Sequence, residues 1–209
     1  MITIIDYGVG NINAFVNMYR RLDVPVTIAR NASELRGARK LLLPGVGHFD
    51  HAITELNKSG MRNLLDDMVM VQKIPVIGIC VGMQMMANTS DEGTVEGLGW
   101  INGRVKRLDE SLISHRTKLP HMGWNDVFPT REHPLFEGIE NDALFYFLHS
   151  YHFVCGDTSH ILATSSYGST FTCATHRENI YGILFHPEKS HHSGAALLYN
   201  FSKLKDAQT

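Results

Sequence analysis

Apolar positions in the first hundred residues alternate between short continuous runs and helical spacing. Four runs have the length of buried strands, and we predict strands over 2–5, 24–29, 40–49 and 75–80, the third broken by Pro44 and Gly45. Helical spacing predicts helices over 11–22 and 61–71, and a further helix can start at 81–88. The expected inward-facing positions of the first two helices are Ile12, Phe15, Val16, Tyr19, Leu22, Met61, Leu64, Leu65 and Met68.

The pattern changes after about Gly99. Short β-rich segments separated by turn residues predict strands within 99–105, 122–128, 144–153, 160–167, 171–176 and 180–185. A last helix is predicted over 191–204, with Ala195, Leu198 and Phe201 facing inward. Together these elements predict an α/β fold with a mostly parallel sheet flanked by helices and extra antiparallel strands in the C-terminal half. Without an internal repeat or linker, 1–209 is expected to form a single domain.

Composition narrows the class of protein. The chain has 209 residues, of which 44% are hydrophobic, and this is enough apolar sequence for one sizeable core. A net charge of −2 gives no indication of a nucleic-acid surface. We expect a cytoplasmic protein, because there is no export signal, no membrane-length apolar run and no paired cysteine spacing.

Two glycine-rich segments follow predicted strands. "DYGVGNIN" matches the dinucleotide fingerprint G-x-G-x-x-G at Gly8 and Gly10, but Asn13 stands at its last position. A tight turn, with Asn11 or Asn13 capping the next helix, is therefore favoured over a nucleotide site. "LPGVGHF" places glycines around Val46, and such a loop can direct a backbone N–H at an anion or can simply be a turn.

Cys80 is the clearest candidate for a reacting group. It ends a predicted strand, precedes a predicted helix and has glycines two positions away on each side, Gly78 and Gly82. This is the pattern of a nucleophile elbow, in which a reactive side chain stands on a sharp strand-to-helix turn. The helix N-terminus would favour the thiolate, and the N–H of Val81 would face a developing oxyanion. The alternative is a buried structural cysteine, which we expect for Cys155 and Cys173.

His186 and Glu188 supply a candidate base and its orienting carboxylate. Both lie in "GILFHPEKS", directly after a predicted buried strand. If Pro187 keeps this segment extended, residues i and i+2 face the same way and Glu188 can accept from one ring nitrogen. The alternative is a strand-ending His-Pro turn with a solvated glutamate. A metal site is not indicated, because no cysteine pair or H-E-x-x-H accompanies the histidines.

The motifs "GICVGMQ", "PGVGHF", "PHMGWN", "HSY" and "FHPEKS" together resemble those of the class I, or triad, glutamine amidotransferases. "PHMGWN" and "HPEKS" narrow the resemblance to the glutaminase subunits of imidazole glycerol phosphate synthase. The chain differs in having Leu184 before the "FHPE" phenylalanine, where the family often has Gln. The resemblance implies a flavodoxin-like α/β sandwich that needs no cofactor.

The resemblance also implies roles for individual residues. Cys80, His186 and Glu188 would be the catalytic triad, and Val81 and Val46 would supply the oxyanion-hole amides. Glutamine recognition is implied around Gln84, Glu92, Ser150 and Tyr151. The implied partner is a HisF-like TIM-barrel cyclase, which takes the ammonia to make imidazole glycerol phosphate and AICAR in histidine biosynthesis. Its contacts would include Asn11, Trp124 and Lys189.

Three other functions stay open at this point. A related glutaminase could supply ammonia to a sugar amidotransferase of surface-polysaccharide synthesis. A regulatory or scaffold subunit without catalysis is a second alternative, and a stand-alone thiol hydrolase is a third.

Overall fold

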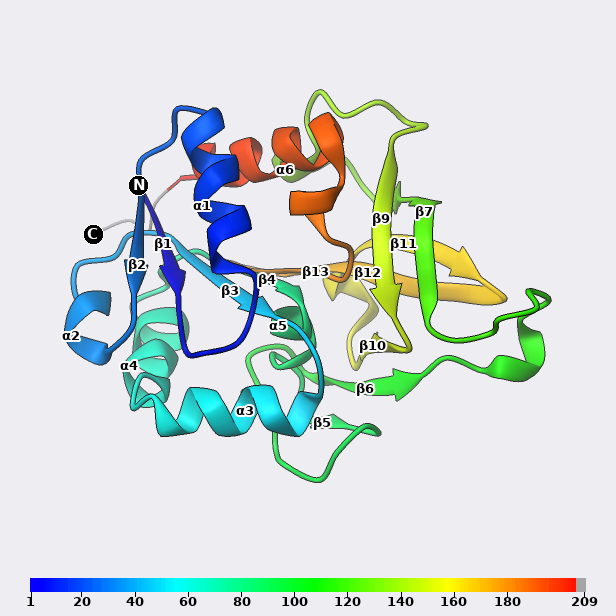
Figure 1. Ribbon diagram of the computed structural model, residues 1–209, viewed down its shortest axis with the longest axis horizontal. Coiled ribbons are helices and arrows are strands. Elements are labelled where there is room, and N and C mark those ends of the chain that lie inside the picture. The colour runs from blue at the N-terminus through cyan, green and yellow to red at the C-terminus, as the bar shows by residue number, and fades with distance from the viewer. Residues whose placement is uncertain (206–209) are drawn as a thin grey trace.

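Five neighbouring strands form the parallel half of the main sheet, and helices cover both of its faces. The computed structural model describes residues 1–205, and its sheet begins in the order β2-β1-β3-β4-β13 with every neighbouring pair parallel. Helices α1 and α6 lie on one face, and α3 and α4 lie on the other (Figure 1). The strands of this half are β1 (Ile2–Ile5), β2 (Val26–Ala29), β3 (Leu41–Gly45), β4 (Val76–Cys80) and β13 (Ile180–Ile183).

The helices of the first half connect these strands. They are α1 (Ile12–Arg21), α2 (Ala32–Leu35), α3 (Phe49–Lys58), α4 (Arg62–Asp66), a π-helical turn η1 (Asp67–Val71) and α5 (Val81–Gln84). The C-terminal α6 (His191–Lys203) completes the set.

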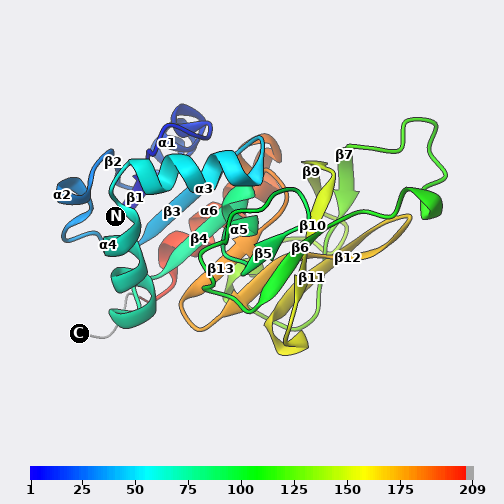
Figure 2. The ribbon, with the colours of Figure 1, turned by 90° about the horizontal axis from the view of Figure 1, so that it is seen from below.

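The second half extends the sheet with mainly antiparallel pairs. Beyond β13 the order continues β12-β10-β6-β5, β11 pairs with both β12 and β8, and β7 and β9 form a separate two-stranded ribbon (Figure 2). These strands are β5 (Thr89–Ser90), β6 (Gly103–Arg107), β7 (His121–Asp126), β8 (Phe128–Pro129), β9 (Leu144–His149), β10 (Tyr151–Cys155), β11 (Ile161–Tyr167) and β12 (Ser169–Arg177). Short 3-10 turns are η2 (Glu110–Leu112), η3 (Pro134–Phe136), η4 (Thr158–His160) and η5 (Pro187–Lys189). The predicted α/β architecture is confirmed.

Local signals account for α1. Asn11 is its N-cap, with the side-chain oxygen accepting from the Ala14 N–H, so the preference for a capped turn is confirmed. Phe15, Val16 and Tyr19 are buried, as the helical spacing predicts, and Ile12 and Leu22 pack partly against the same core.

Three local predictions need correction. The third strand is not broken at Pro44, because β3 runs through it to Gly45. The 61–71 segment is not one α-helix, since its last five residues form the π-helical turn η1. Helix α3 was not predicted, although Phe49, Ala52, Ile53 and Leu56 are buried at helical spacing.

The C-terminal helix is confirmed, with a small change of inner face. Leu198 and Phe201 are buried, whereas Ala195 is only partly buried. Of the two cysteines expected in the core, Cys173 is buried, and Cys155, at the end of β10, is partly buried and packs against the core. No helix within residues 1–205 is long and apolar enough to cross a membrane.

Candidate active site

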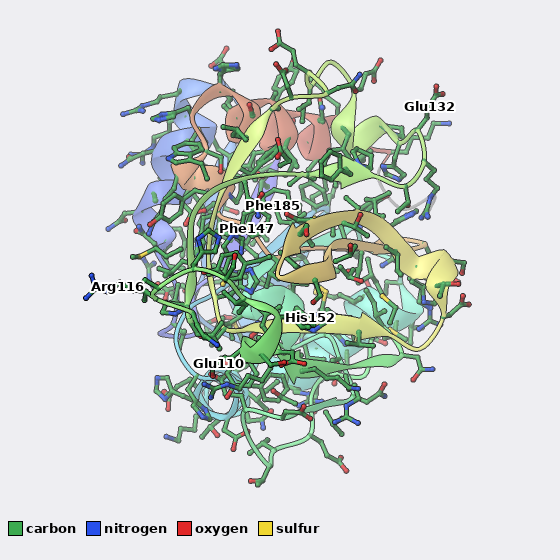
Figure 3. All side chains as sticks on the ribbon, turned by 90° about the vertical axis from the view of Figure 1, so that its right-hand side faces the viewer. Glu110, Arg116, Glu132, Phe147, His152 and Phe185 are labelled. Atoms are coloured by element: carbon green, nitrogen blue, oxygen red, sulfur yellow. The ribbon has the colours of Figure 1, made fainter. Side chains whose placement is uncertain are left out.

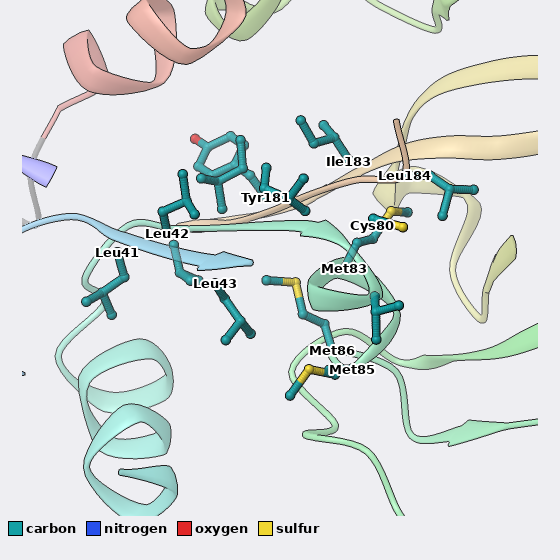
Figure 4. Close-up of a cluster of buried hydrophobic side chains, with 14 of the residues drawn as sticks. Leu41, Leu42, Leu43, Cys80, Met83, Met85, Met86, Tyr181, Ile183 and Leu184 are labelled. Carbon is teal, nitrogen blue, oxygen red and sulfur yellow. The ribbon is translucent and has the colours of Figure 1, made fainter. Parts of the chain in front are cut away.

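Cys80 occupies a strained turn between β4 and α5. It has φ 54° and ψ −112°, a backbone conformation that costs a non-glycine residue energy and is tolerated where the surroundings enforce it. The register pairs Cys80 with Gly45 of β3 and pairs Ile79 with Ile183 of β13. Figure 4 shows Cys80 within a cluster of buried hydrophobic side chains that includes Met83, Ile183 and Leu184. The "PGVG" loop and the His186 segment therefore flank the cysteine.

The glycines around Cys80 are required by close backbone packing. A Cβ on Gly82 would collide with the carbonyl oxygen of Leu43, and one on Gly78 would stand 2.6 Å from the Gly82 carbonyl oxygen. A Cβ on Gly45 would collide with the Gly82 backbone nitrogen. The expected steric reason for the G-x-C-x-G pattern is thus present, and it includes the neighbouring strand β3.

His186 stands next to both Cys80 and Glu188. Its Nδ1 lies 2.8 Å from Glu188 Oε1, and the Cys80 side chain is close enough to raise the pKa of its ring. The reason given from the sequence was wrong, because Pro187–Lys189 form a 3-10 turn and not an extended segment. The turn folds the glutamate back under the imidazole, and both side chains are at least 95% buried, since their exposed fractions are 5% and 3%.

Backbone contacts with β9 hold His186 in place. The His186 N–H donates to the Tyr146 carbonyl at 2.8 Å, and the Ser190 hydroxyl donates to the His186 carbonyl at 2.6 Å. The same hydroxyl accepts from the Tyr146 N–H at 3.0 Å. The histidine is therefore fixed by a backbone hydrogen bond to β9 and by the bonds of the Ser190 hydroxyl.

The charge balance at the site favours a protonated His186. Burial opposes its cationic form, but hydrogen bonds and opposite charges from Cys80 and Glu188 outweigh burial and raise the pKa of His186 from 6.5 to about 10. Burial, followed by the charge of Cys80, also raises the pKa of Tyr7 above its usual value, so its hydroxyl stays neutral.

Removal of the Cys80 side chain is expected to lower the pKa of His186. In Cys80→Ala the desolvation penalty persists, while the hydrogen bond and charge from the sulfur are lost. A pH titration of the ring by NMR should show the lower value in the variant. Since the folded-state pKa of about 10 lies above the ordinary 6.5, protonation of His186 stabilises the folded chain; this contribution is complete below pH 6.5 and is lost as the pH rises through 10. An unchanged pKa in the variant would contradict the coupling of His186 to Cys80.

The helix after Cys80 contributes less than the sequence suggested. Helix α5 has only 4 residues, so few peptide dipoles add up at its N-terminus. The imidazolium of His186 is therefore the main positive charge available to the thiolate.

The two candidate oxyanion-hole residues lie on opposite sides of the turn. Val81 begins α5 and is 4% exposed, whereas Val46 directly follows β3 and is 42% exposed. The base of the Val46 loop is held by the Tyr7 hydroxyl, which donates to the Pro44 carbonyl at 2.7 Å. The structure thus puts both residues next to Cys80 in sequence or in register.

The candidate glutamine-binding residues divide into two groups. Gln84 is buried on α5, and its Nε2 donates to the Tyr151 carbonyl at 3.1 Å, which joins the elbow to the start of β10, directly after Ser150. Glu92 is partly buried, and its Oε2 accepts from the Phe49 N–H at 2.9 Å. Glu92 therefore anchors the start of α3, directly after the "PGVGH" loop.

All three candidate partner contacts are exposed residues. Trp124 is 44% exposed on β7, stacks on His191 with ring centroids 5.0 Å apart and meets Tyr146 edge-on. Lys189 places its Nζ 5.5 Å from the Tyr146 ring centroid. Asn11 is exposed at the start of α1, a helix that packs against the η5 turn carrying Lys189. Trp124, Tyr146 and Lys189 thus share one surface.

One pair of buried polar residues was not assigned from the sequence. His121 and His149 face each other across the β7–β9 ribbon, with His121 Nδ1 and His149 Nε2 3.0 Å apart. Both belong to motifs noted in the sequence, "PHMGWN" and "HSY", but their contact depends on the pairing of β7 with β9. Within residues 1–205, no group of three or more His, Cys, Asp or Glu side chains could hold a metal ion.

The chain is similar to known proteins along nearly its whole length. The family model of the class-I glutamine amidotransferases matches residues 3–204. Two relatives named "Imidazole glycerol phosphate synthase subunit HisH" are similar to this chain along their whole length. The one from Bdellovibrio bacteriovorus is 55% identical and the one from Leptospira borgpetersenii 48%, each over 98% of this chain.

A crystal structure described as a glutamine amidotransferase has the same fold. It superposes with a TM-score of 0.73 at 17% identity and covers 96% of both chains. The family match and the full-length relatives establish that the chain belongs to the class-I glutamine amidotransferase family.

Proposed function

We propose that this chain is a glutaminase subunit that hydrolyses L-glutamine to glutamate and ammonia and passes the ammonia to a HisF-like cyclase. The placing of Cys80, His186 and Glu188 at the end of the parallel strands, with His186 bonded to Glu188 and electrostatically coupled to Cys80, carries this proposal. Full-length similarity to proteins named as HisH subunits of imidazole glycerol phosphate synthase supports the choice of histidine biosynthesis.

The chemistry follows from the three side chains. The Cys80 thiolate attacks the side-chain amide carbon of glutamine, and the oxyanion accepts hydrogen bonds from the Val81 and Val46 amides. The His186 imidazolium gives its proton to the departing nitrogen, the C–N bond breaks, and ammonia leaves behind a glutamyl thioester. His186, now neutral, takes a proton from water as it attacks; the C–S bond breaks, releasing glutamate and restoring the thiolate. Glu188 keeps the imidazole oriented throughout.

A single domain over 1–209, a cytoplasmic location and a heterodimer with the cyclase complete the proposal. Ammonia is protonated and lost in water, so a glutaminase of this kind should deliver it directly to the partner's synthase reaction. The expected products of the coupled reaction are imidazole glycerol phosphate and AICAR.

The decisive assay measures glutamate release with and without candidate partners. The isolated chain should hydrolyse glutamine slowly, and a HisF-like cyclase with its substrate bound should increase the rate strongly. A sugar amidotransferase of surface-polysaccharide synthesis is the matched comparison. If only that enzyme activated the chain, the chain would serve polysaccharide synthesis and not histidine biosynthesis. Equal rates with and without every partner would contradict a coupled glutaminase.

Trp124→Ala is expected to weaken partner binding. The indole is exposed yet fixed by stacking on His191, so it can enter a partner pocket at little entropic cost. We expect the dissociation constant for the cyclase to rise by about 30-fold, which corresponds to about 2 kcal/mol. Titration calorimetry can measure it, with Phe128→Ala as the control, because Phe128 is 53% exposed on β8, outside the proposed contact. Equal effects of both substitutions would contradict the assignment.

A further inference from the structure

The His121–His149 pair belongs to a longer chain of buried hydrogen bonds. Asn125 Nδ2 lies 3.2 Å from His121 Nε2, His121 Nδ1 lies 3.0 Å from His149 Nε2, and His149 Nδ1 lies 2.9 Å from the Tyr151 carbonyl oxygen. The two histidines are only 3% and 6% exposed. The chain therefore runs from inside β7, through the end of β9, to the first residue of β10.

The partners fix the position of every proton in this chain. A carbonyl oxygen only accepts, so His149 must donate from Nδ1, and its neutral Nε2 must accept. His121 must then donate from Nδ1 and accept at Nε2. Asn125 supplies that last hydrogen, and the other hydrogen of its amide goes to the Ser166 carbonyl at 2.8 Å. All bonds point one way, and both rings are Nδ1–H tautomers.

The surroundings keep both histidines neutral. Burial, followed by the charge of His115, lowers the pKa of His121 to about 4. Burial lowers the pKa of His149 to about 3, with further lowering from His121, His152 and His186, against the raising effect of the Tyr151 carbonyl. The hydrogen-bond chain is thus a set of fixed dipoles at neutral pH.

This chain of hydrogen bonds ends at the candidate glutamine site. The Tyr151 carbonyl accepts from His149 and also from Gln84 Nε2 at 3.1 Å, so one oxygen connects the histidine chain to the helix that follows Cys80. On the same strand as His149, the Leu148 carbonyl oxygen is 4.0 Å from Cys80 Sγ. A shift of His149 would therefore displace Tyr151, Gln84 and the strand beside the thiol together.

We propose that His121 and His149 are positioning residues that hold the Ser150–Tyr151 segment and Gln84 in the geometry that binds glutamine. This inference rests on the proposed glutaminase function and adds residues that act through others, without touching the reacting atoms. The competing explanation is packing alone, because the His121 ring stacks on Tyr167 and Phe147 with centroids 4.1 Å and 4.9 Å away. Figure 3 shows Phe147 in the interior near Phe185, whose ring centroid is 5.6 Å away.

Two substitutions at His121 separate hydrogen bonding from packing. His121→Phe keeps an aromatic ring between Tyr167 and Phe147 but removes the donor to His149. His121→Asn loses most of the stacking but keeps an amide N–H near the Nδ1 position. We expect KM for glutamine to rise about tenfold in His121→Phe with kcat nearly unchanged, and to stay close to the wild-type value in His121→Asn. All assays use the complex with the cyclase, and thermal unfolding verifies that each variant is folded.

His133→Phe is the matched control. His133 is a half-buried histidine in another aromatic group, 4.6 Å from the His176 ring, and its Nδ1 accepts from the Leu135 N–H. Its replacement should lower the unfolding temperature without changing KM. If KM rose as much in His133→Phe as in His121→Phe, general destabilisation would explain both effects and the proposal would be overturned.

NMR of the imidazole nitrogens tests the proton positions without any activity. Both His121 and His149 of the wild-type chain should carry their proton on Nδ1, and an Nε2–H tautomer in either ring would overturn the proposal. Equal KM in His121→Phe and wild type, or a larger rise in His121→Asn than in His121→Phe, would do the same. Failure of the glutaminase function itself would appear differently, as glutamine hydrolysis that survives in Cys80→Ala.

Discussion

Cys80→Ala is expected to abolish glutamine hydrolysis while the folded structure and partner binding persist. The alanine keeps the backbone of the turn but removes the only atom that can form the thioester, so kcat/KM should fall by about 10⁴-fold or more. The measurement is glutamate release by the chain in complex with its cyclase, in the presence of glutamine. Ammonia supplied directly should still support the cyclase, since its own site is untouched.

Cys155→Ala provides the matched control. Cys155 is partly buried on β10, and burial together with the charge of Asp157 raises the pKa of its thiol to about 12, so it is a poor nucleophile. Its replacement should leave hydrolysis unchanged, and a glutamine-like chloroketone should label Cys80 alone. Retained hydrolysis in Cys80→Ala, or loss in Cys155→Ala, would refute the assignment of the nucleophile.

Gly82→Ala should have the second-largest effect, on stability as well as activity. The new Cβ would overlap the Leu43 carbonyl oxygen, a backbone atom of a buried central strand that cannot move aside easily. We expect the free energy of unfolding to fall by about 3 kcal/mol and the turn that holds Cys80 to shift, with loss of hydrolysis. Chemical denaturation and the glutaminase assay measure the two effects.

Gly37→Ala is the control for a glycine substitution as such. Gly37 has φ +81° in open space, so its replacement meets only the backbone penalty, about 1 kcal/mol. Activity should be retained there. If Gly82→Ala were as stable and as active as Gly37→Ala, the close approach of β3 to α5 would have no functional consequence.

Local pattern predicted the parallel half of the fold well. The runs at Ile2, Val26, Leu41 and Val76 are continuous and β-rich, and each of these positions lies in a strand of the structure. Helix α3 was not predicted, even though its buried residues have helical spacing. It begins directly after the "PGVG" loop, which the sequence indicated only as a loop or turn. Cys155 was placed in the core, and in the structure it is partly buried at the end of β10, packed against the edge of the core.

The candidate site was predicted partly for the right reason. The steric need for Gly78 arises across the turn, as expected, since its Cβ would meet the Gly82 carbonyl, whereas the need for Gly82 comes from Leu43 of the neighbouring strand β3. Glu188 contacts His186 through a 3-10 turn that Pro187 begins, whereas the sequence suggested an extended segment. Two residues this close in the chain can meet by more than one backbone path, so the contact was predictable but its geometry was not.

The sequence by itself determined the strand runs, the strained glycine-flanked turn at Cys80 and the nearness of Glu188 to His186, because these depend on residues within a few positions of one another. The tertiary structure alone decided that β13 inserts beside β4, which brings His186 to Cys80. It alone decided that β7 pairs with β9, so that His121 meets His149 and the hydrogen-bond chain reaches Tyr151. Strand pairing between distant segments is set by the packing of the whole core, and that information is spread over the chain and absent from any single motif.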